Sequence, residues 1–156
     1  MPDAARTRAH DEPEAQAATT AADPPKRILL ERRTEDGDDL HADRVGVDGS
    51  VWRQTTVRAR FDASGALKIG RGPASWERLG ILDARSLRSL RAAIIESGAA
   101  DLPDEVRAEF AALSGFDVLW TLADRSVLVR GAPAATTPGL ERLGAALDRA
   151  IAGAHA

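Results

Sequence analysis

The chain has 156 residues, of which 44% are hydrophobic and 29% charged, an ordinary balance for one soluble globular domain with its own core. It contains no Cys and no Tyr, and the absence of Cys excludes disulfides and thiolate metal sites. Its formal net charge of −3 gives no long-range attraction to nucleic acid or to an anionic membrane.

Residues 1–26 are rich in Ala, Pro, Asp and Thr, and their one large apolar side chain is Met1. Such a segment cannot bury enough surface to offset its ordering entropy, so we predict a disordered tail before a single α+β domain over residues 27–153. The N-terminus lacks the apolar core of a signal peptide, and no stretch approaches the roughly 18 apolar residues of a membrane span. We therefore expect a cytoplasmic protein.

The first half of the domain has the pattern of an antiparallel sheet. Residues 28–30 predict a short strand, and the acidic residues 35–39 predict an exposed turn. Asp48-Gly49 lies between two strand-like runs, residues 43–47 and 51–61. An Asp-Gly pair in that position favours a tight hairpin, because the turn needs positive φ at both residues.

Alternating side chains in the second run indicate a sheet with one exposed face. Val57, Ala59 and Phe61 would point inward, and the outward set is Gln54, Thr56, Arg58 and Arg60. After a second turn at residues 62–65, Leu67 and Ile69 are expected to continue the inner face, and residues 76–82 predict another strand.

The second half contains two amphipathic helices. Asp83 is a suitable N-cap for a first helix that carries Leu87, Leu90 and Ile94 on one side, and Gly98 suits its left-handed end. A Pro and several acids at residues 101–105 predict a short helix reaching about Phe110.

Alternation at residues 116–122 and 127–129 predicts another hairpin. Thr137-Pro138 then opens a second long helix, whose apolar stripe consists of Leu140, Leu143, Leu147 and Ile151. We therefore predict an α+β, two-layer sandwich, with an antiparallel sheet of about five to six strands and two main helices on one face.

The layout from Leu82 to Ile151 combines a helix, a Leu-Pro connection, a hairpin and a Pro-initiated helix. The residues that carry a comparison are Leu87, Leu90, Asp101-Leu102-Pro103, Val127-Leu128-Val129 and Thr137-Pro138-Gly139-Leu140-Glu141-Arg142-Leu143. In these features the chain resembles emfourin, a family of small bacterial inhibitors of thermolysin-like metalloproteases. The resemblance implies a similar fold and a metalloprotease partner. It assigns no inhibitory residue, because Ala99-Ala100 stands where aromatics are expected and residues 104–113 are an extra segment.

Few residues indicate chemistry. The three histidines, His10, His41 and His155, fall in predicted tails or a loop, so the usual general base is missing from the expected core. We assign no catalytic, cofactor-binding or metal-binding residue and expect no cofactor. The leading hypothesis is a non-enzymatic module that binds a protein partner, and inhibition of a protease is its most specific form.

A possible interaction surface consists of Trp52, Arg58, Arg60, Trp76, Arg85 and Arg88. Trp is enriched in binding hot spots, and arginines at every third position of the first helix, continuing to Arg91, would form a basic ridge. Nucleic-acid binding through that ridge stays open as a weak alternative, although the net acidity disfavours it. A carboxylate- or metal-dependent enzyme is the other alternative, with acids drawn from Asp101, Asp104, Glu105 and Glu109. The simpler interpretation of those acids is attraction to a helix N-terminus.

Overall fold

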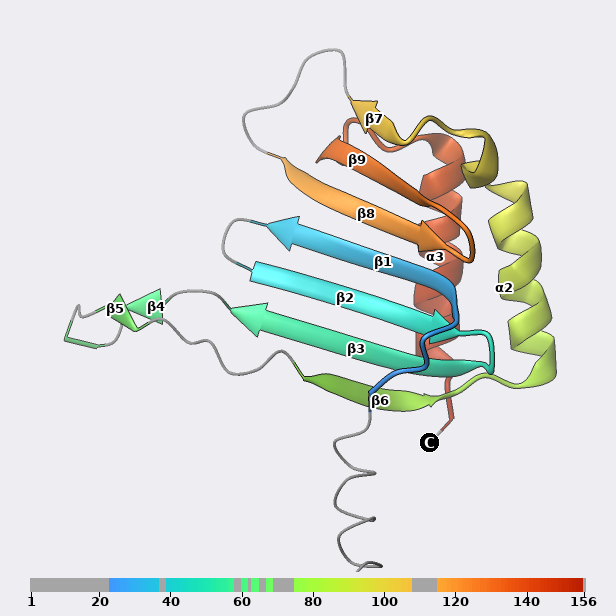
Figure 1. Cartoon of the computed structure of the whole chain (residues 1–156), viewed down its shortest axis with the longest axis horizontal. Coiled ribbons are helices and arrows are strands. Elements are labelled where there is room, and N and C mark those ends of the chain that lie inside the picture. The colour runs from blue at the N-terminus through green and yellow to red at the C-terminus, as the bar shows by residue number, and fades with distance from the viewer. Residues whose placement is uncertain are drawn as a thin grey trace, which may run out of the picture.

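Seven strands form one mixed sheet in the computed structural model, which describes residues 23–36, 39–57, 60–61, 63–64, 67–68, 75–107 and 115–155 (Figure 1). In sheet order the strands are β6 (Trp76–Ile81), β3 (Ser50–Val57), β2 (Asp39–Gly46), β1 (Ile28–Asp36), β8 (Phe116–Leu122), β9 (Ser126–Ala132) and β7 (Glu105–Arg107). The predicted α+β class is confirmed. The predicted strand number was too low, and the sheet is not purely antiparallel, because β7 pairs with β9 in parallel.

The first strand in the sequence lies at the middle of the sheet, between β2 and β8. It is longer than predicted, because antiparallel pairing on both sides extends it through Glu35 and Asp36. Asp39 already belongs to β2, where it pairs with Asp36, so these acids lie in strands and the prediction of a turn over all of residues 35–39 was wrong. Of the predicted disordered tail, residues 1–22 lie outside the described residues.

The hairpin at Asp48-Gly49 is confirmed. Its turn differs from the expected one, because Gly49 has a φ of 87° whereas the φ of Asp48 is not positive. Strand β3 ends at Val57, and β4 (Arg60–Phe61) pairs with β5 (Leu67–Lys68) in a separate two-stranded sheet. The prediction that Leu67 continues the main sheet is therefore wrong, because its Cα partner is Phe61. Ile69 lies outside the described residues.

Both long helices begin and end near the predicted residues. Helix α2 (Ala84–Glu96) is capped by Asp83, which accepts a 2.7 Å hydrogen bond from the Ser86 backbone N–H, and Gly98 follows with a φ of 69°. Helix α3 (Pro138–Ala152) is capped by the Thr137 hydroxyl, which accepts from the Leu140 backbone N–H over 3.2 Å. These caps satisfy backbone donors that the first turn leaves without partners.

The short helix predicted over residues 101–110 is wrong. A single 3-10 turn, η1 (Ala99–Asp101), precedes strand β7. Glu105 forms ion pairs with Arg130 of β9 and with Arg107, and the β7 backbone pairs with Leu128 to Arg130. Tertiary pairing therefore overrides the local helix signals. Residues 108–114 are outside the described part of the chain.

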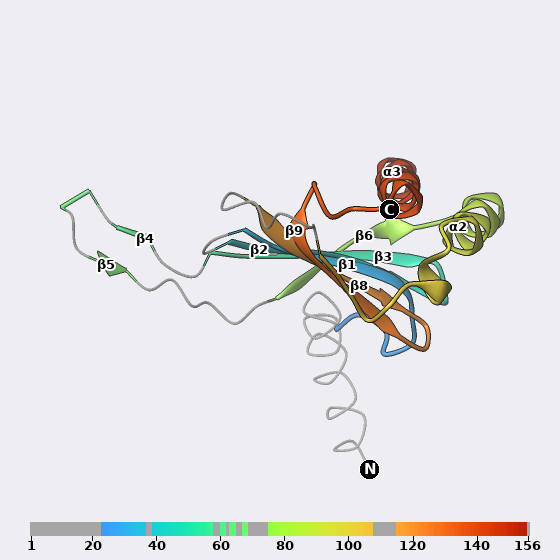
Figure 2. The same ribbon diagram turned by 90° about the horizontal axis from the view of Figure 1, so that it is seen from above.

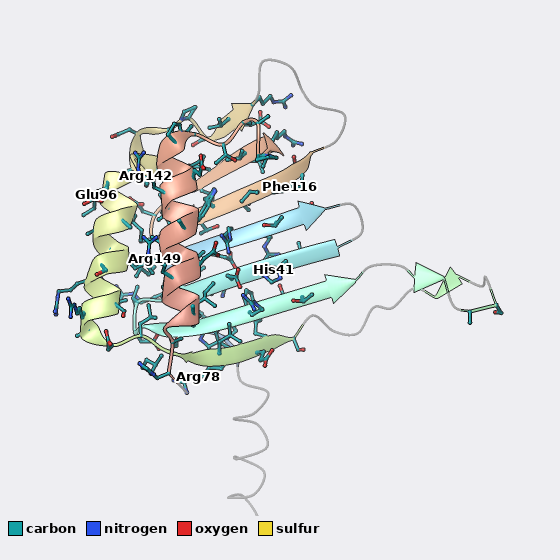
Figure 3. The ribbon with its side chains drawn as sticks, turned by 180° about the vertical axis from the view of Figure 1, so that it is seen from behind. His41, Arg78, Glu96, Phe116, Arg142 and Arg149 are labelled. Carbon is teal, nitrogen blue, oxygen red and sulfur yellow. The ribbon has the colours of Figure 1, made fainter. Side chains whose placement is uncertain are left out.

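Both helices lie on the same side of the sheet, toward one end of the strands (Figure 2). Leu90 of α2 and Leu140, Leu143 and Leu147 of α3 are buried in the same core cluster as Leu30 of β1 and other strand residues. Beyond α3 the strands continue, so part of the helix-side face is not covered by a helix (Figure 3). No helix within the described ranges is long and apolar enough to cross a membrane.

Candidate functional site

The helix-side face of the sheet changes character along the strands, in three successive rows of cross-strand neighbours. The first row consists of Leu122, Leu30, Val45 and Val51 on β8, β1, β2 and β3, and it is part of the core. The second row, on the same strands, consists of Trp120, Arg32, Asp43 and Arg53. The third consists of Val118, Thr34, His41 and Thr55. From the first row to the third, the residues on β1, β2 and β3 therefore change from apolar to charged and then to uncharged polar or His, while β8 stays apolar in all three rows.

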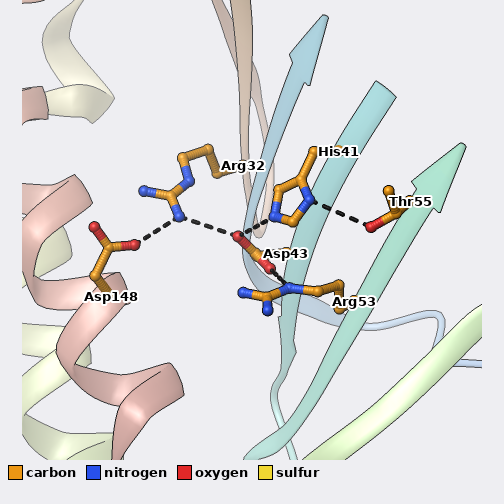
Figure 4. A network of polar contacts seen from close by, with 6 residues as sticks. All are labelled: Arg32, His41, Asp43, Arg53, Thr55 and Asp148. Atoms are coloured by element: carbon orange, nitrogen blue, oxygen red, sulfur yellow. Dashed lines mark hydrogen bonds and ion pairs between the residues drawn. The ribbon is translucent and has the colours of Figure 1, made fainter. Parts of the chain in front are cut away.

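Asp43 is the centre of the second row (Figure 4). Its side chain has no exposed surface, and Arg53 Nε donates a 2.9 Å hydrogen bond to Oδ1. Arg32 Nη2 donates to Oδ2 over 3.0 Å, and His41 Nε2 lies 3.2 Å from the same oxygen. A buried carboxylate needs such partners to offset its lost hydration. One buried group therefore fixes three side chains that reach toward solvent.

Electrostatics favour the charged forms of Asp43 and Arg32. Burial by itself would raise the pKa of Asp43, but hydrogen bonds from Arg53 and Arg32 hold that pKa below its ordinary value. Burial would also lower the pKa of Arg32, and its contacts with Asp148 and Asp43 raise it instead. Arg32 Nη2 reaches Asp148 of α3 over 2.7 Å, which ties the sheet to the helix.

His41 lies in β2, so its placement in a loop was wrong. Its Nε2 faces Asp43 and its Nδ1 lies 3.4 Å from Thr55 Oγ1, on the neighbouring strand. The missed signal was alternation: Leu40 and Ala42 are buried, while His41 and Asp43 point toward the helix side. Of the other histidines, His155 forms an isolated bridge with Ile81 at the edge of β6, and His10 lies outside the described residues.

A groove of about 470 Å³ opens beside the network, between α3 and the uncovered end of the sheet. Its lining is Arg32, Thr34, His41, Phe116, Val118, Trp120, Ala132, Pro133, Thr136, Leu140, Glu141 and Gly144. Figure 3 shows Phe116 and His41 on this uncovered part of the sheet. We call this space the α3 groove. Most of its walls are apolar side chains, and Arg32, His41 and Glu141 supply the ionisable groups.

The predicted surface residues are not brought together. Trp52 is only 7% exposed, and its Nε1 donates to Ser50 Oγ over 2.9 Å, so it offers no exposed contact. Trp76 is half-buried on β6, with the Arg44 guanidinium 4.5 Å from its ring centre. Arg58 lies outside the described residues, and Arg60 belongs to the separate β4–β5 sheet.

Helix α2 presents Arg85, Arg88 and Arg91 to solvent, as expected of the predicted ridge. Arg85 lines a groove between α2 and α3, whereas Arg88 and Arg91 do not line it. A step of three residues turns a helix by about 300°, so side chains spaced only by three drift around the helix. The arginine row therefore winds around α2, and only its first member lies at the groove.

Two of the four acids considered for catalysis, Asp104 and Glu105, form structural ion pairs, and Asp101 lies in the η1 turn. Asp104 accepts from Arg125 over 2.9 Å, and Glu105 pairs with Arg107 and Arg130, which hold the pKa of Glu105 below its ordinary value. Attraction to a helix N-terminus was the wrong explanation for both, because neither residue lies in a helix. Glu109 is outside the described residues. Within the described ranges, no group of three His, Asp or Glu side chains could hold a metal ion.

No family model, curated protein or solved structure matches this chain. Functional inference therefore depends on the geometry of the α3 groove, the Asp43 network and the helical surface.

Proposed function

We propose that the chain is a two-layer, non-enzymatic protein-interaction module that acts in the cytoplasm and binds a segment of a partner protein in the α3 groove. The observation that carries this proposal is the combination of an apolar groove with a row of polar side chains at its open side. Its volume of about 470 Å³ lies within the range of pockets that hold compact ligands or side chains. At least one apolar side chain of the partner enters the groove.

Phe116, Val118 and Leu140 form apolar walls for that side chain. Thr34 provides a hydroxyl at the groove, where it meets the peptide backbone of the partner, and the His41 ring lies beside it as a wall. The charge of Arg32 is already offset by Asp43 and Asp148, so the proposed partner segment is uncharged where it enters the groove. The buried carboxylate of Asp43 holds Arg32 and His41 in place before binding, which reduces the entropy lost on association.

Gly144 allows a direct test, because it lies in the wall of the groove and carries no side chain. The Gly144→Leu substitution fills the groove, whereas Gly144→Ala adds only a methyl group at ordinary contact distance from Arg32 and Trp120. The full chain and both variants would be immobilised and used to select from a peptide-display library. Peptides enriched by the original chain and by Gly144→Ala, and lost with Gly144→Leu, would support the proposal. No enrichment, or equal enrichment by all three proteins, would contradict it.

Inhibition of a metalloprotease is the most specific form of this proposal, and it depends on the resemblance to emfourin. The test is titration of thermolysin with the full chain, followed by the two Gly144 variants. Inhibition that is weakened by Gly144→Leu would support a protease inhibitor. No inhibition at micromolar concentrations would exclude inhibition of thermolysin, and the peptide-selection test of the wider proposal would still stand.

A hydrolase is the second candidate function, favoured by the arrangement of Thr55, His41 and Asp43. A hydroxyl beside an imidazole that a carboxylate orients is the general pattern of an activated nucleophile. In this assignment the neutral His41 ring takes the Thr55 hydroxyl proton on Nδ1 while Oγ1 attacks the acyl carbon of an ester substrate. The same proton passes to the leaving alcohol as the acyl C–O bond breaks, and water then hydrolyses the ester formed on Thr55 with His41 again accepting the proton. Turnover of p-nitrophenyl acetate that is abolished by both Thr55→Val and His41→Ala would favour the hydrolase. Turnover equal to the buffer rate would exclude it for this ester.

A further inference from the structure

The outer seam between α2 and α3 is a second surface, separate from the α3 groove. The two helices are antiparallel, and Figure 3 shows Glu96 of α2 and Arg142 of α3 near the same end. Two grooves of about 430 and 270 Å³ follow this seam, and they share Ala93, Glu96, Ala146 and Arg149. Because the lining residues are shared, the grooves form one continuous depression, which we call the helical seam.

The apolar side chains that line the floor of the helical seam are small, apart from one leucine. The floor consists of Leu90, Ala92, Ala93, Ala145, Ala146 and Ala150. Small side chains let another backbone approach closely, so a third helix or an extended chain can pack into such a depression. The floor would supply burial of apolar surface but little orientation.

Three arginines, Arg85, Arg142 and Arg149, line the seam. The side chains of all three form no hydrogen bond or ion pair with another described residue, whereas the sheet arginines Arg32 and Arg53 are bound to carboxylates. Glu96 is the one acid among the lining residues. The seam therefore carries an excess of positive charge on a chain whose formal net charge is −3.

That charge pattern points to an acidic protein segment rather than to nucleic acid. Single-stranded nucleic acid is bound by aromatic stacking together with positive charge, and no aromatic residue lines the seam. Glu96 would also repel a continuous phosphate backbone. A peptide with separate carboxylates avoids Glu96 and places apolar side chains on the alanine floor.

We infer that the helical seam docks an acidic amphipathic helix of a partner protein, with its small apolar face on the alanine floor and its carboxylates on Arg142 and Arg149. These two arginines are seven residues apart, which is roughly 10 Å along a helix. A docked helix that carries Glu at positions i and i+7 presents carboxylates at the same spacing. Arg85 meets a third acid toward the other end of the seam.

The test is fluorescence anisotropy with a set of labelled 15-residue helical peptides that carry Glu at i and i+7 beside an Ala/Leu face. Control peptides have the same composition in scrambled order. The charge-reversal variant is Arg142→Glu with Arg149→Glu, and its matched control is Arg88→Glu with Arg91→Glu, which changes the net charge equally at exposed positions away from the seam. Circular dichroism and urea denaturation check that both variants remain folded.

The expected result is binding of at least one ordered peptide in preference to its scrambled form, with affinity reduced about tenfold or more by reversal at the seam and by less than about threefold by the control reversal. Equal losses in both variants would show general attraction of opposite charges and overturn the inference. It would also be overturned if no ordered peptide bound at 100 µM, or if a single-stranded oligonucleotide bound more tightly than every peptide. The α3 groove does not include these arginines, so either proposal can fail alone.

Discussion

Asp43 and Arg53 lie directly opposite each other on β2 and β3, and Arg53 Nε donates a 2.9 Å hydrogen bond to the fully buried Asp43 carboxylate. Arg32 approaches the same carboxylate from β1 and continues to Asp148 of α3. Asp43 therefore connects three strands, and Arg32 extends the network to the helix. Because these contacts also position His41 at the α3 groove, the stability of the fold and the shape of the proposed site depend on the same carboxylate.

Replacing Asp43 with Asn is expected to lower the free energy of unfolding by about 3 kcal/mol, because Arg53 then loses its counter-charge and Arg32 keeps only the exposed Asp148. Urea denaturation at pH 7 would measure the change. The matched control is Asp148→Asn, which removes the exposed partner of Arg32 and is expected to cost less than about 1 kcal/mol. Similar losses for the two variants would show that the Asp43 carboxylate is not the principal electrostatic contact.

The same residue predicts how stability depends on pH. Its pKa in the folded chain lies below the value in the unfolded chain, which is about 3.9. Such a carboxylate stabilises the fold above the unfolded pKa, and this contribution is lost as the pH falls through the folded pKa. The free energy of unfolding should therefore fall more steeply below about pH 4 for the original chain than for Asp43→Asn. Parallel pH profiles from urea denaturation would assign the acid sensitivity to other carboxylates.

Two glycines of α3 are expected to respond oppositely to the same substitution. A Cβ at Gly144 would lie 3.6 Å from Arg32 Nη1, an ordinary contact, so Gly144→Ala should stabilise the helix by about 0.5 to 1 kcal/mol. A Cβ at Gly139 would collide with the backbone carbonyl of Ser97, so Gly139→Ala should destabilise by about 1 to 3 kcal/mol. Thermal denaturation of both variants tests the packing of α3 against the end of α2. Changes of the melting temperature in the same direction for both variants would contradict this packing.

The cap of α3 gives a further prediction. Thr137→Ala removes the hydroxyl that accepts from the Leu140 backbone N–H and should cost about 1 kcal/mol in the free energy of unfolding. The adjacent Thr136 is a matched control, because its hydroxyl makes no hydrogen bond to a described residue, and Thr136→Ala should change stability by less than about 0.5 kcal/mol. Equal effects in chemical denaturation would show that Thr137 does not cap the helix.

Features set by neighbouring residues could be predicted from the sequence. Asp83 and Gly98 mark the two ends of α2, and Asp48-Gly49 marks a hairpin, because caps and tight turns depend on a few consecutive side chains. Strand β7 could not be predicted in this way. The acids in and before β7 form a pattern that is typical of a helix N-terminus. The strand conformation of β7 depends instead on parallel pairing with β9, which lies more than 20 residues later in the chain.

The Asp43 network was missed for a related reason. Its members come from β1, β2, β3 and α3, and only the register of the strands brings them together. The alternation of residues 40–43 did contain a signal for His41, since Leu40 and Ala42 share one face of β2. The partners of that histidine could be identified only once the register between strands was known.

The position of the earliest strand at the centre of the sheet has a consequence for biosynthesis. While the ribosome is still making the middle of the chain, β1 can pair with β2, but its other backbone edge has no partner until residues 117–122 have emerged. An open strand edge is a template for pairing with other chains. The newly made polypeptide is thus most prone to aggregate just before the second half of the sheet joins the first, and chaperone capture would be most useful at that stage.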